Sequence, residues 1–192
     1  MQYPKSTQPL PEHAKKVFEG ILFSVWQWEQ KMFDGSVATF EKVSRNSSVG
    51  IFAFTKDKKI ILTVQEQPGI QQFVSLVGGI VDQGEDVLES AHRELLEETG
   101  CVTRDIEFWY SVQPVTKVEW PVYMFVARNC EQVAPLKLDA GEKIQLQFAS
   151  WDEFLQIIHK DEFRDKEVAL KLLRLKDNPE KLKELEKFLF RE

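Results

Sequence analysis

Five charged residues close together in this sequence have the types and spacing that do chemistry. Glu94, Glu97 and Glu98 stand at positions i, i+3 and i+4, so on a helix their carboxylates would be neighbours. Two carboxylates about 5 Å apart repel each other by roughly 3 kcal/mol at an effective dielectric of about 20. Arg93 can relieve one such pair but not the whole set, which Glu85 joins by folding back from the helix start. A hard divalent cation, Mg²⁺ or Mn²⁺, would relieve the remainder, because such ions prefer oxygen ligands.

The helix that would carry these acids is predicted over residues 86–99. The acidic and polar stretch 82–86 suits a turn and a helix start, and Gly100 would end the helix as a left-handed cap. The acids lie on one face, which is either a cation site or simply a solvated acidic surface. The apolar residues of the buried stripe recur at helical spacing on another face: Val87, Leu88, Ala91 and Leu95.

The stretch from Gly79 to Cys101 resembles the Nudix box, G-x5-E-x7-R-E-U-x-E-E-x-G-U, in which U is apolar. A chance match of this length is on the order of 10⁻⁹ per window. By this resemblance the chain is identified as a member of the Nudix hydrolases, which cleave a nucleoside diphosphate linked to another group. Every specified position of the box is filled: Gly79, Glu85, Arg93, Glu94, Leu95, Glu97, Glu98, Gly100 and Cys101.

The resemblance implies a metal site, with Mg²⁺ as the cofactor and Mn²⁺ as the alternative. Glu94 and Glu98, one helical turn apart, would hold the first ion, with the backbone carbonyl of Gly78 as a third ligand. Glu97 and Glu85 would hold or orient a second ion. The ions would neutralise the diphosphate, polarise a P–O bond and lower the pKa of a bound water.

The residue that activates this water is expected in an acidic loop ahead of the last predicted strand. Glu142 is the best match by position and Asp139 the second, and the alternative is a plain turn acid. Glu142 would take the proton of the water or position the water. Glu97 and Arg93 complete the predicted catalytic set, with Arg93 as an orienting partner for Glu85.

The expected fold class is α/β. The resemblance implies the Nudix fold, an α/β/α sandwich around a mixed β-sheet, with an N-terminal antiparallel β-meander and extra C-terminal helices added. We expect residues 1–45 to be an N-terminal extension with a β-hairpin, residues 46–160 the Nudix hydrolase domain, and residues 161–192 C-terminal helices. A short helix is predicted over residues 11–19, with proline in its first turn.

The meander, the Gly-Gly entry to the box and the acidic loop look like the ADP-ribose pyrophosphatase branch. That resemblance implies a homodimer built by the N-terminal strands, and ADP-ribose or a nucleotide sugar as substrate. A housecleaning nucleoside triphosphate or dinucleotide pyrophosphohydrolase and a non-catalytic Nudix-like nucleotide-binding module are the alternatives. Trp26 and Trp28 share one strand face, and either pack the meander down or stack on a substrate base. One departure is the sequence TVQEQPG, residues 63–69, where that branch often carries a basic RQYR-like run.

Composition sets the remaining expectations. The net charge of −6 and the absence of a basic run argue against a nucleic-acid partner. The two cysteines show no metal-ligand or redox spacing and fit reduced thiols in a cytosol. The N-terminus lacks the apolar core of a signal peptide, and no segment approaches the ~20 apolar residues of a membrane span. A cytoplasmic protein without membrane contact is therefore expected.

Overall fold

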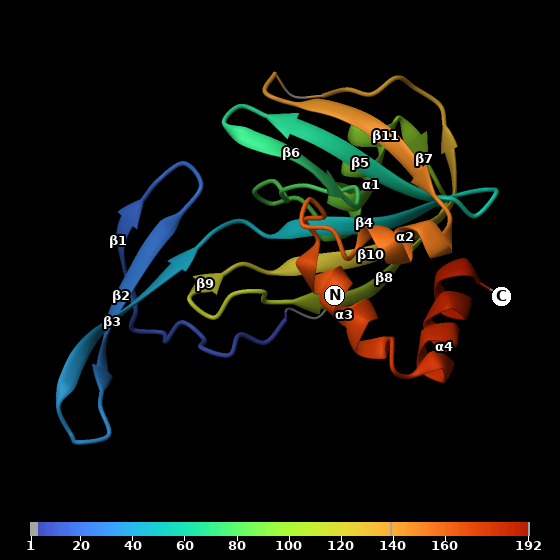
Figure 1. The fold of residues 1–192 in the computed structure, drawn as a ribbon. Coiled ribbons are helices and arrows are strands. Elements are labelled where there is room, and N and C mark those ends of the chain that lie inside the picture. The colour runs from blue at the N-terminus through green and yellow to red at the C-terminus, as the bar shows by residue number, and fades with distance from the viewer. Residues whose placement is uncertain (1–3, 139, 192) are drawn as a thin grey trace.

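A mixed seven-stranded β-sheet forms the centre of the fold (Figure 1). The computed structural model describes residues 4–138 and 140–191. The strand order is β11-β5-β4-β10-β7, with β6 paired to β5 and β8 paired to β10; β4 and β10 run parallel. The strands of this sheet are β4 (Ser48–Thr55), β5 (Ile60–Gln67), β6 (Ile70–Ser75), β7 (Cys101–Val102), β8 (Asp105–Val112), β10 (Val122–Gln132) and β11 (Lys143–Ala149).

Helices cover both faces of this sheet (Figure 1). One helix packs on the first face, and three helices from the C-terminal part of the chain pack on the other. In the described part of the chain, no helix combines the length and the apolar character needed to cross a membrane. The helices are α1 (Val87–Thr99) on the first face, and α2 (Trp151–Ile157), α3 (Lys166–Leu175) and α4 (Pro179–Phe190) on the second.

Strand β4 shows how the sequence produces two cores. Successive side chains of a strand point to opposite faces of its sheet. Ile51 and Ala53 therefore lie with Leu95 of α1 in one buried cluster. Phe52 and Phe54 lie in a second cluster with buried side chains of α2, α3 and α4. Burial on both faces explains the continuous apolar run of this strand, and the predicted α/β/α sandwich around a mixed sheet is confirmed.

A second sheet of four strands extends away from this sandwich as an arm (Figure 1). Its order is β1-β2-β3-β9, in which β1, β2 and β3 form the expected antiparallel meander. Asp34 and Gly35 make the tight turn between β2 and β3, where the Asp34 side chain accepts hydrogen bonds from Ser36. The strands of the arm are β1 (Lys15–Glu19), β2 (Ser24–Lys31), β3 (Val37–Ser44) and β9 (Val118–Glu119).

The helix predicted over residues 11–19 was wrong. The chain turns at residues 12–13, and strand β1 follows. In β1, Lys16 pairs with Trp26 and Phe18 with Val25 of β2. A helix of so few residues is marginal in water, whereas cross-strand side-chain pairs each stabilise a sheet. Pairing with β2 therefore overrides the local helix signal.

A buried lysine joins the arm to the sandwich. Lys42 of β3 is only 1% exposed, and its Nζ donates to a Glu119 carboxylate oxygen, to Ser6 Oγ (2.8 Å) and to the Gln8 carbonyl (2.6 Å). Glu119 belongs to β9, in the connection between the sandwich strands β8 and β10, so this one ammonium group ties the N-terminal segment and the meander to that connection. A buried charge is tolerated because an opposite charge and further acceptors surround it.

Candidate active site

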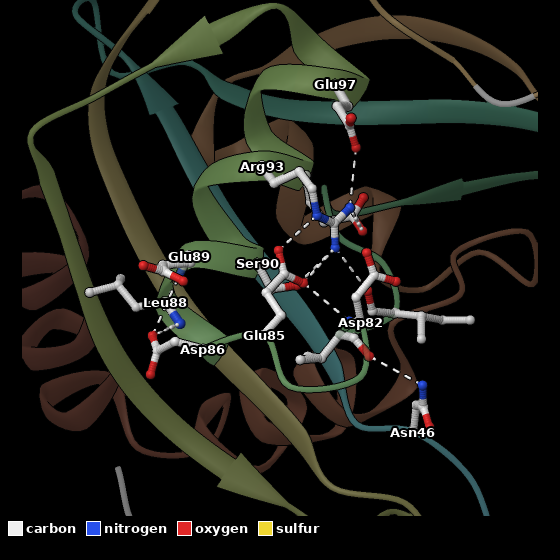
Figure 2. A network of polar contacts seen from close by, with 12 residues as sticks. Asn46, Asp82, Glu85, Asp86, Leu88, Glu89, Ser90, Arg93 and Glu97 are labelled. Carbon is white, nitrogen blue, oxygen red and sulfur yellow. Dashed lines mark hydrogen bonds and ion pairs between the residues drawn. The ribbon is translucent and has the colours of Figure 1, made fainter.

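Helix α1 begins and ends where the sequence indicated. The Asp86 side chain accepts hydrogen bonds from the backbone N–H groups of Leu88 (2.8 Å) and Glu89 (3.4 Å), and so caps the N-terminus (Figure 2). Gly100 has a φ of 69°, the left-handed conformation of a helix C-cap. The two caps fix the limits of the helix and therefore the face on which its glutamates lie.

Arg93 is the centre of a charged network on this face (Figure 2). Its Nε and Nη2 donate to the two carboxylate oxygens of Glu85, both at 2.9 Å. Nη1 donates to Glu94 Oε1 (2.8 Å) and Glu97 Oε2 (3.1 Å), and Nη2 also donates to the Ile80 carbonyl (3.0 Å). The guanidinium lowers the pKa of Glu85 to about 2, mainly through these hydrogen bonds. Arg93 therefore holds three carboxylates and the glycine-rich turn in fixed positions.

Glu98 is the most buried of the acids, with 6% of its surface exposed. Burial raises its pKa to about 8; the hydrogen bond from the Gly78 backbone N–H (2.9 Å) opposes this shift, and the charges of Glu94 and Glu142 add to it. Burial likewise raises the pKa of Glu94, and Glu97 and Glu142 contribute to that shift. The negative charges of Glu94, Glu98 and Glu142 therefore repel one another across the space between them. A cation bound in that space would relieve the repulsion.

The glycine-rich turn packs directly against one of these carboxylates. A Cβ atom at Gly79 would lie 2.3 Å from Glu94 Oε1, which no side chain could tolerate without displacement of the carboxylate. A larger residue at this position would push the end of the Glu94 side chain away from the turn.

The loop that leads to Glu142 is anchored to the C-terminal end of α1. The Val133 N–H donates to the Gly100 carbonyl (2.8 Å), and the Lys137 N–H donates to the Glu97 carbonyl (2.8 Å). The Lys137 ammonium also lies 3.6 Å from a Glu97 carboxylate oxygen. Asp139, the second choice for the water-activating acid, lies outside the described residues.

One cavity of about 570 Å³ gathers most of the predicted site. Glu85 is the exception, because it lies on the other side of the Arg93 guanidinium and lines a different hollow. The cavity is lined by six of the predicted residues, Gly78, Arg93, Glu94, Glu97, Glu98 and Glu142, together with Gln65, Gln67, Gly79, Ile80, Asp82 and Lys137.

The donor set of this cavity fits a hard divalent cation. Its acidic side chains present carboxylate oxygens, which are the ligands that Mg²⁺ and Mn²⁺ prefer. As the side chains lie, no three Asp, Glu, His or Cys residues of the described chain converge on a single point that could hold an ion. Arg93 draws Glu94 and Glu97 towards itself, while Gly78 holds Glu98. A cation bound here would therefore require Glu94 and Glu97 to turn away from Arg93.

A second, more apolar cavity of about 460 Å³ adjoins the first. The two cavities share Gln65, Gly78, Gly79 and Ile80. Trp26 and Trp28 line neither: the Trp26 indole donates to Ser44 Oγ (2.8 Å) within the arm, and Trp28 is 6% exposed. The apolar residues that line the second cavity include Phe73, Leu76, Trp120, Val122, Met124 and Val168.

Sequence reasoning missed Gln65 and Trp120. Gln65 donates to Glu98 Oε1 at 3.1 Å from strand β5, and Trp120 lines the apolar cavity from the segment ahead of β10. The sequence of residues 63–69 indicated only that the basic run of the ADP-ribose pyrophosphatase branch is absent there. The signal that could have found Gln65 is its spacing from Thr63, which places two polar side chains on one face of a strand that begins with apolar residues. Trp120 carries no such local signal.

Comparisons with known proteins agree with this geometry. The family model of the NUDIX domain matches residues 44–172, which is more than half of the chain. The ADP-ribose pyrophosphatase of Bacillus subtilis (strain 168) is 24% identical over 181 residues, covering 90% of this chain and 96% of the relative. The methanol dehydrogenase activator of Bacillus methanolicus is 25% identical over 170 residues, covering 85% of this chain and 91% of the relative.

A solved structure extends the comparison to the whole fold. The crystal structure of an ADP compounds hydrolase superposes with a TM-score of 0.69, covering 90% of this chain and 97% of that one, at 21% identity. The resemblance to the ADP-ribose pyrophosphatase branch that the sequence indicated is thus confirmed. The chain belongs to the Nudix family and is a pyrophosphohydrolase.

Proposed function

We propose that the enzyme uses a divalent cation to hydrolyse the pyrophosphate bond of a nucleoside diphosphate linked to another moiety, with ADP-ribose as the first candidate. Water would add to one phosphorus as the bridging P–O bond breaks. The products would be a nucleoside monophosphate and a phosphorylated remainder. The observation that carries this proposal is the cavity in which Glu94, Glu98 and Glu142 face one another beside an apolar cavity.

The carboxylates of α1 would hold the cation, which is Mg²⁺ or its substitute Mn²⁺. Glu94 and Glu98, with the Gly78 carbonyl, are the proposed ligands of a first ion, and Glu97 that of a second. Glu85 lines the neighbouring hollow with both oxygens on Arg93, and would orient the second site through that arginine. When bound, such ions supply positive charge that neutralises the diphosphate and makes water more acidic. Carboxylate oxygens suit this role because they bind hard ions without redox chemistry.

The other residues of the chain position what reacts. Glu142 would take a proton from the attacking water or hold that water, because it is the acid that enters the cavity from outside α1. Arg93 would hold Glu85, Glu94 and Glu97 in place and keep Glu85 ionised. The apolar cavity beside Gly78 would take the nucleoside or the sugar, so that the diphosphate lies over the carboxylates.

We also propose a homodimer through the arm. Several large apolar side chains of the arm face solvent, and Phe33 and Phe18 are 113% and 59% exposed. An exposed apolar surface of this kind marks an interaction site. A second copy of the chain is the occupant we propose, since an arm that protrudes from one copy can lie against the sandwich of another (Figure 1).

A hydrolysis screen tests the proposed reaction. ADP-ribose, UDP-glucose, ATP and a diadenosine polyphosphate are each incubated with the full-length enzyme and Mg²⁺, and ion-exchange chromatography separates the products from the substrate. We expect turnover with ADP-ribose that is abolished by EDTA and restored by excess Mg²⁺. Preference for ATP or the dinucleotide would favour the housecleaning alternative. Tight binding of ADP-ribose without any turnover would favour the non-catalytic module.

A further inference from the structure

A buried glutamine of the sheet contacts the most buried glutamate of the box helix. Gln65 lies in β5 and Glu98 in α1, and their exposed fractions are 5% and 6%. Gln65 Nε2 donates to Glu98 Oε1 at 3.1 Å. A buried amide must find partners for its N–H groups, because an unpaired donor away from water is costly. The amide nitrogen, which is a donor, faces a carboxylate oxygen, which is an acceptor.

Two hydroxyl groups hold the Gln65 amide from behind. Its Nε2 lies 3.0 Å from Thr63 Oγ1 and 3.3 Å from Ser75 Oγ. These two hydroxyl oxygens are themselves 2.9 Å apart, and Thr63 pairs with Ser75 in the β5–β6 ladder. All three side chains are buried. The pairing of β5 with β6 therefore places the two hydroxyl groups, and these hold the amide in position.

Glu98 is thus held at both carboxylate oxygens. Gln65 donates to Oε1, and the Gly78 N–H donates to Oε2 at 2.9 Å. Two donors on opposite oxygens fix the plane of a carboxylate and leave a lone pair free on each oxygen. A free glutamate side chain would have to be immobilised before it could bind an ion, and that ordering opposes binding.

We propose that Gln65 is a positioning residue that orients the Glu98 carboxylate for the divalent cation, an inference that rests on the proposed function. Partners in the second coordination shell usually change metal affinity by 10- to 100-fold when they are removed. Gly78 cannot replace Gln65 as the donor to Glu98 Oε1, because the Gly78 N–H donates to Oε2. Thr63 and Ser75 act one step further out, through Gln65.

Titration of the full-length protein with Mn²⁺ alone, followed by calorimetry, tests this role without any substrate. Gln65→Met keeps the length of the side chain and removes the N–H donors, and we expect Mn²⁺ affinity to fall 10- to 100-fold. Gln145→Met is the matched control, because Gln145 is exposed on the neighbouring strand β11, and its affinity should equal that of the parent. Melting curves in EDTA check that each variant is folded.

A second variant guards against a Gln65→Met protein that does not fold. Thr63→Val keeps the shape of the side chain and removes the hydroxyl behind the amide, and we expect a severalfold loss of Mn²⁺ affinity. If the folded variants bind Mn²⁺ within twofold of the parent, the positioning role is overturned. A parent that binds Mn²⁺ but does not cleave ADP-ribose would instead contradict only the proposed substrate.

Discussion

Among single residues, Glu98 should separate catalysis from folding. Its ionised carboxylate destabilises the metal-free fold because it is buried without a cation, and Glu98→Gln removes this destabilising charge. We expect the melting temperature in EDTA at pH 8 to be equal or higher, while Mg²⁺-dependent hydrolysis falls by at least about 100-fold. Glu89→Gln, an exposed change on the same helix, is the control and should retain full activity. A Glu98→Gln enzyme as active as the parent would contradict the metal-site proposal.

Asp165 should make folding depend on pH. Its carboxylate accepts a hydrogen bond from the Leu76 N–H (2.7 Å), but burial raises its pKa to about 6. The native state therefore binds a proton more tightly than the unfolded chain does, and stability falls as the pH rises from about 4 to about 6. The loss is at most about 3 kcal/mol, from roughly two pKa units.

Asp165→Asn keeps an acceptor for Leu76 and removes the charge. We expect this variant to lose the part of the pH dependence that Asp165 causes, and to be more stable relative to the parent at pH 7 than at pH 4. Guanidinium unfolding at pH 4, 5, 6 and 7 measures the difference. Asp161→Asn, an exposed change nearby, should leave the profile of the parent unaltered. Parallel profiles for the parent and Asp165→Asn would show that the charge is not buried in solution.

At the scale of elements, the C-terminal helix is held by a cation from the sheet. Arg128 of β10 is 4% exposed and donates to the carbonyls of Leu189 (2.7 Å) and Phe188 (2.6 Å) at the end of α4. It also pairs with Asp105 and Glu107 of β8. Positive charge at a helix C-terminus is favourable because the helix dipole is negative there. Arg128 therefore connects α4 to the sheet.

Arg128→Met should loosen α4. The change keeps much of the apolar stem but leaves the two α4 carbonyls without their donor, while both carboxylates keep Arg191 as a partner. We expect a loss of about 2–3 kcal/mol, because the carbonyls are unsatisfied and the acids, which are partly exposed, stay paired. Urea unfolding measures the loss, and limited proteolysis should first cut between α3 and α4. Arg104→Met, at an exposed arginine, is the matched control. Unchanged protease resistance of α4 would contradict this connection.

For the whole molecule, local signals predicted helix α1 but neither strand β1 nor the long-range contacts. The caps at Asp86 and Gly100 lie next to the helix that they limit, so sequence alone placed them. The box helix and its acids followed from a fixed spacing. Contacts between distant segments, such as Lys42 with Glu119, carry no periodic signal. Their partners meet only because the sheets pair in a given order.

The arm supplies the prediction that belongs to the whole molecule. A double substitution, Phe18→Glu with Phe33→Glu, places charges on its exposed apolar side chains without touching Lys42 or the cavities. Because burying those charges in an interface would be unfavourable, light scattering after gel filtration should show a single chain where the parent shows two.

Lys31→Glu with Glu41→Lys alters charge on the same arm and should remain dimeric. A parent that is monomeric at micromolar concentration would rule out the arm as a dimer interface. A monomeric double variant with a raised KM for ADP-ribose would show that the second copy contributes to the substrate site.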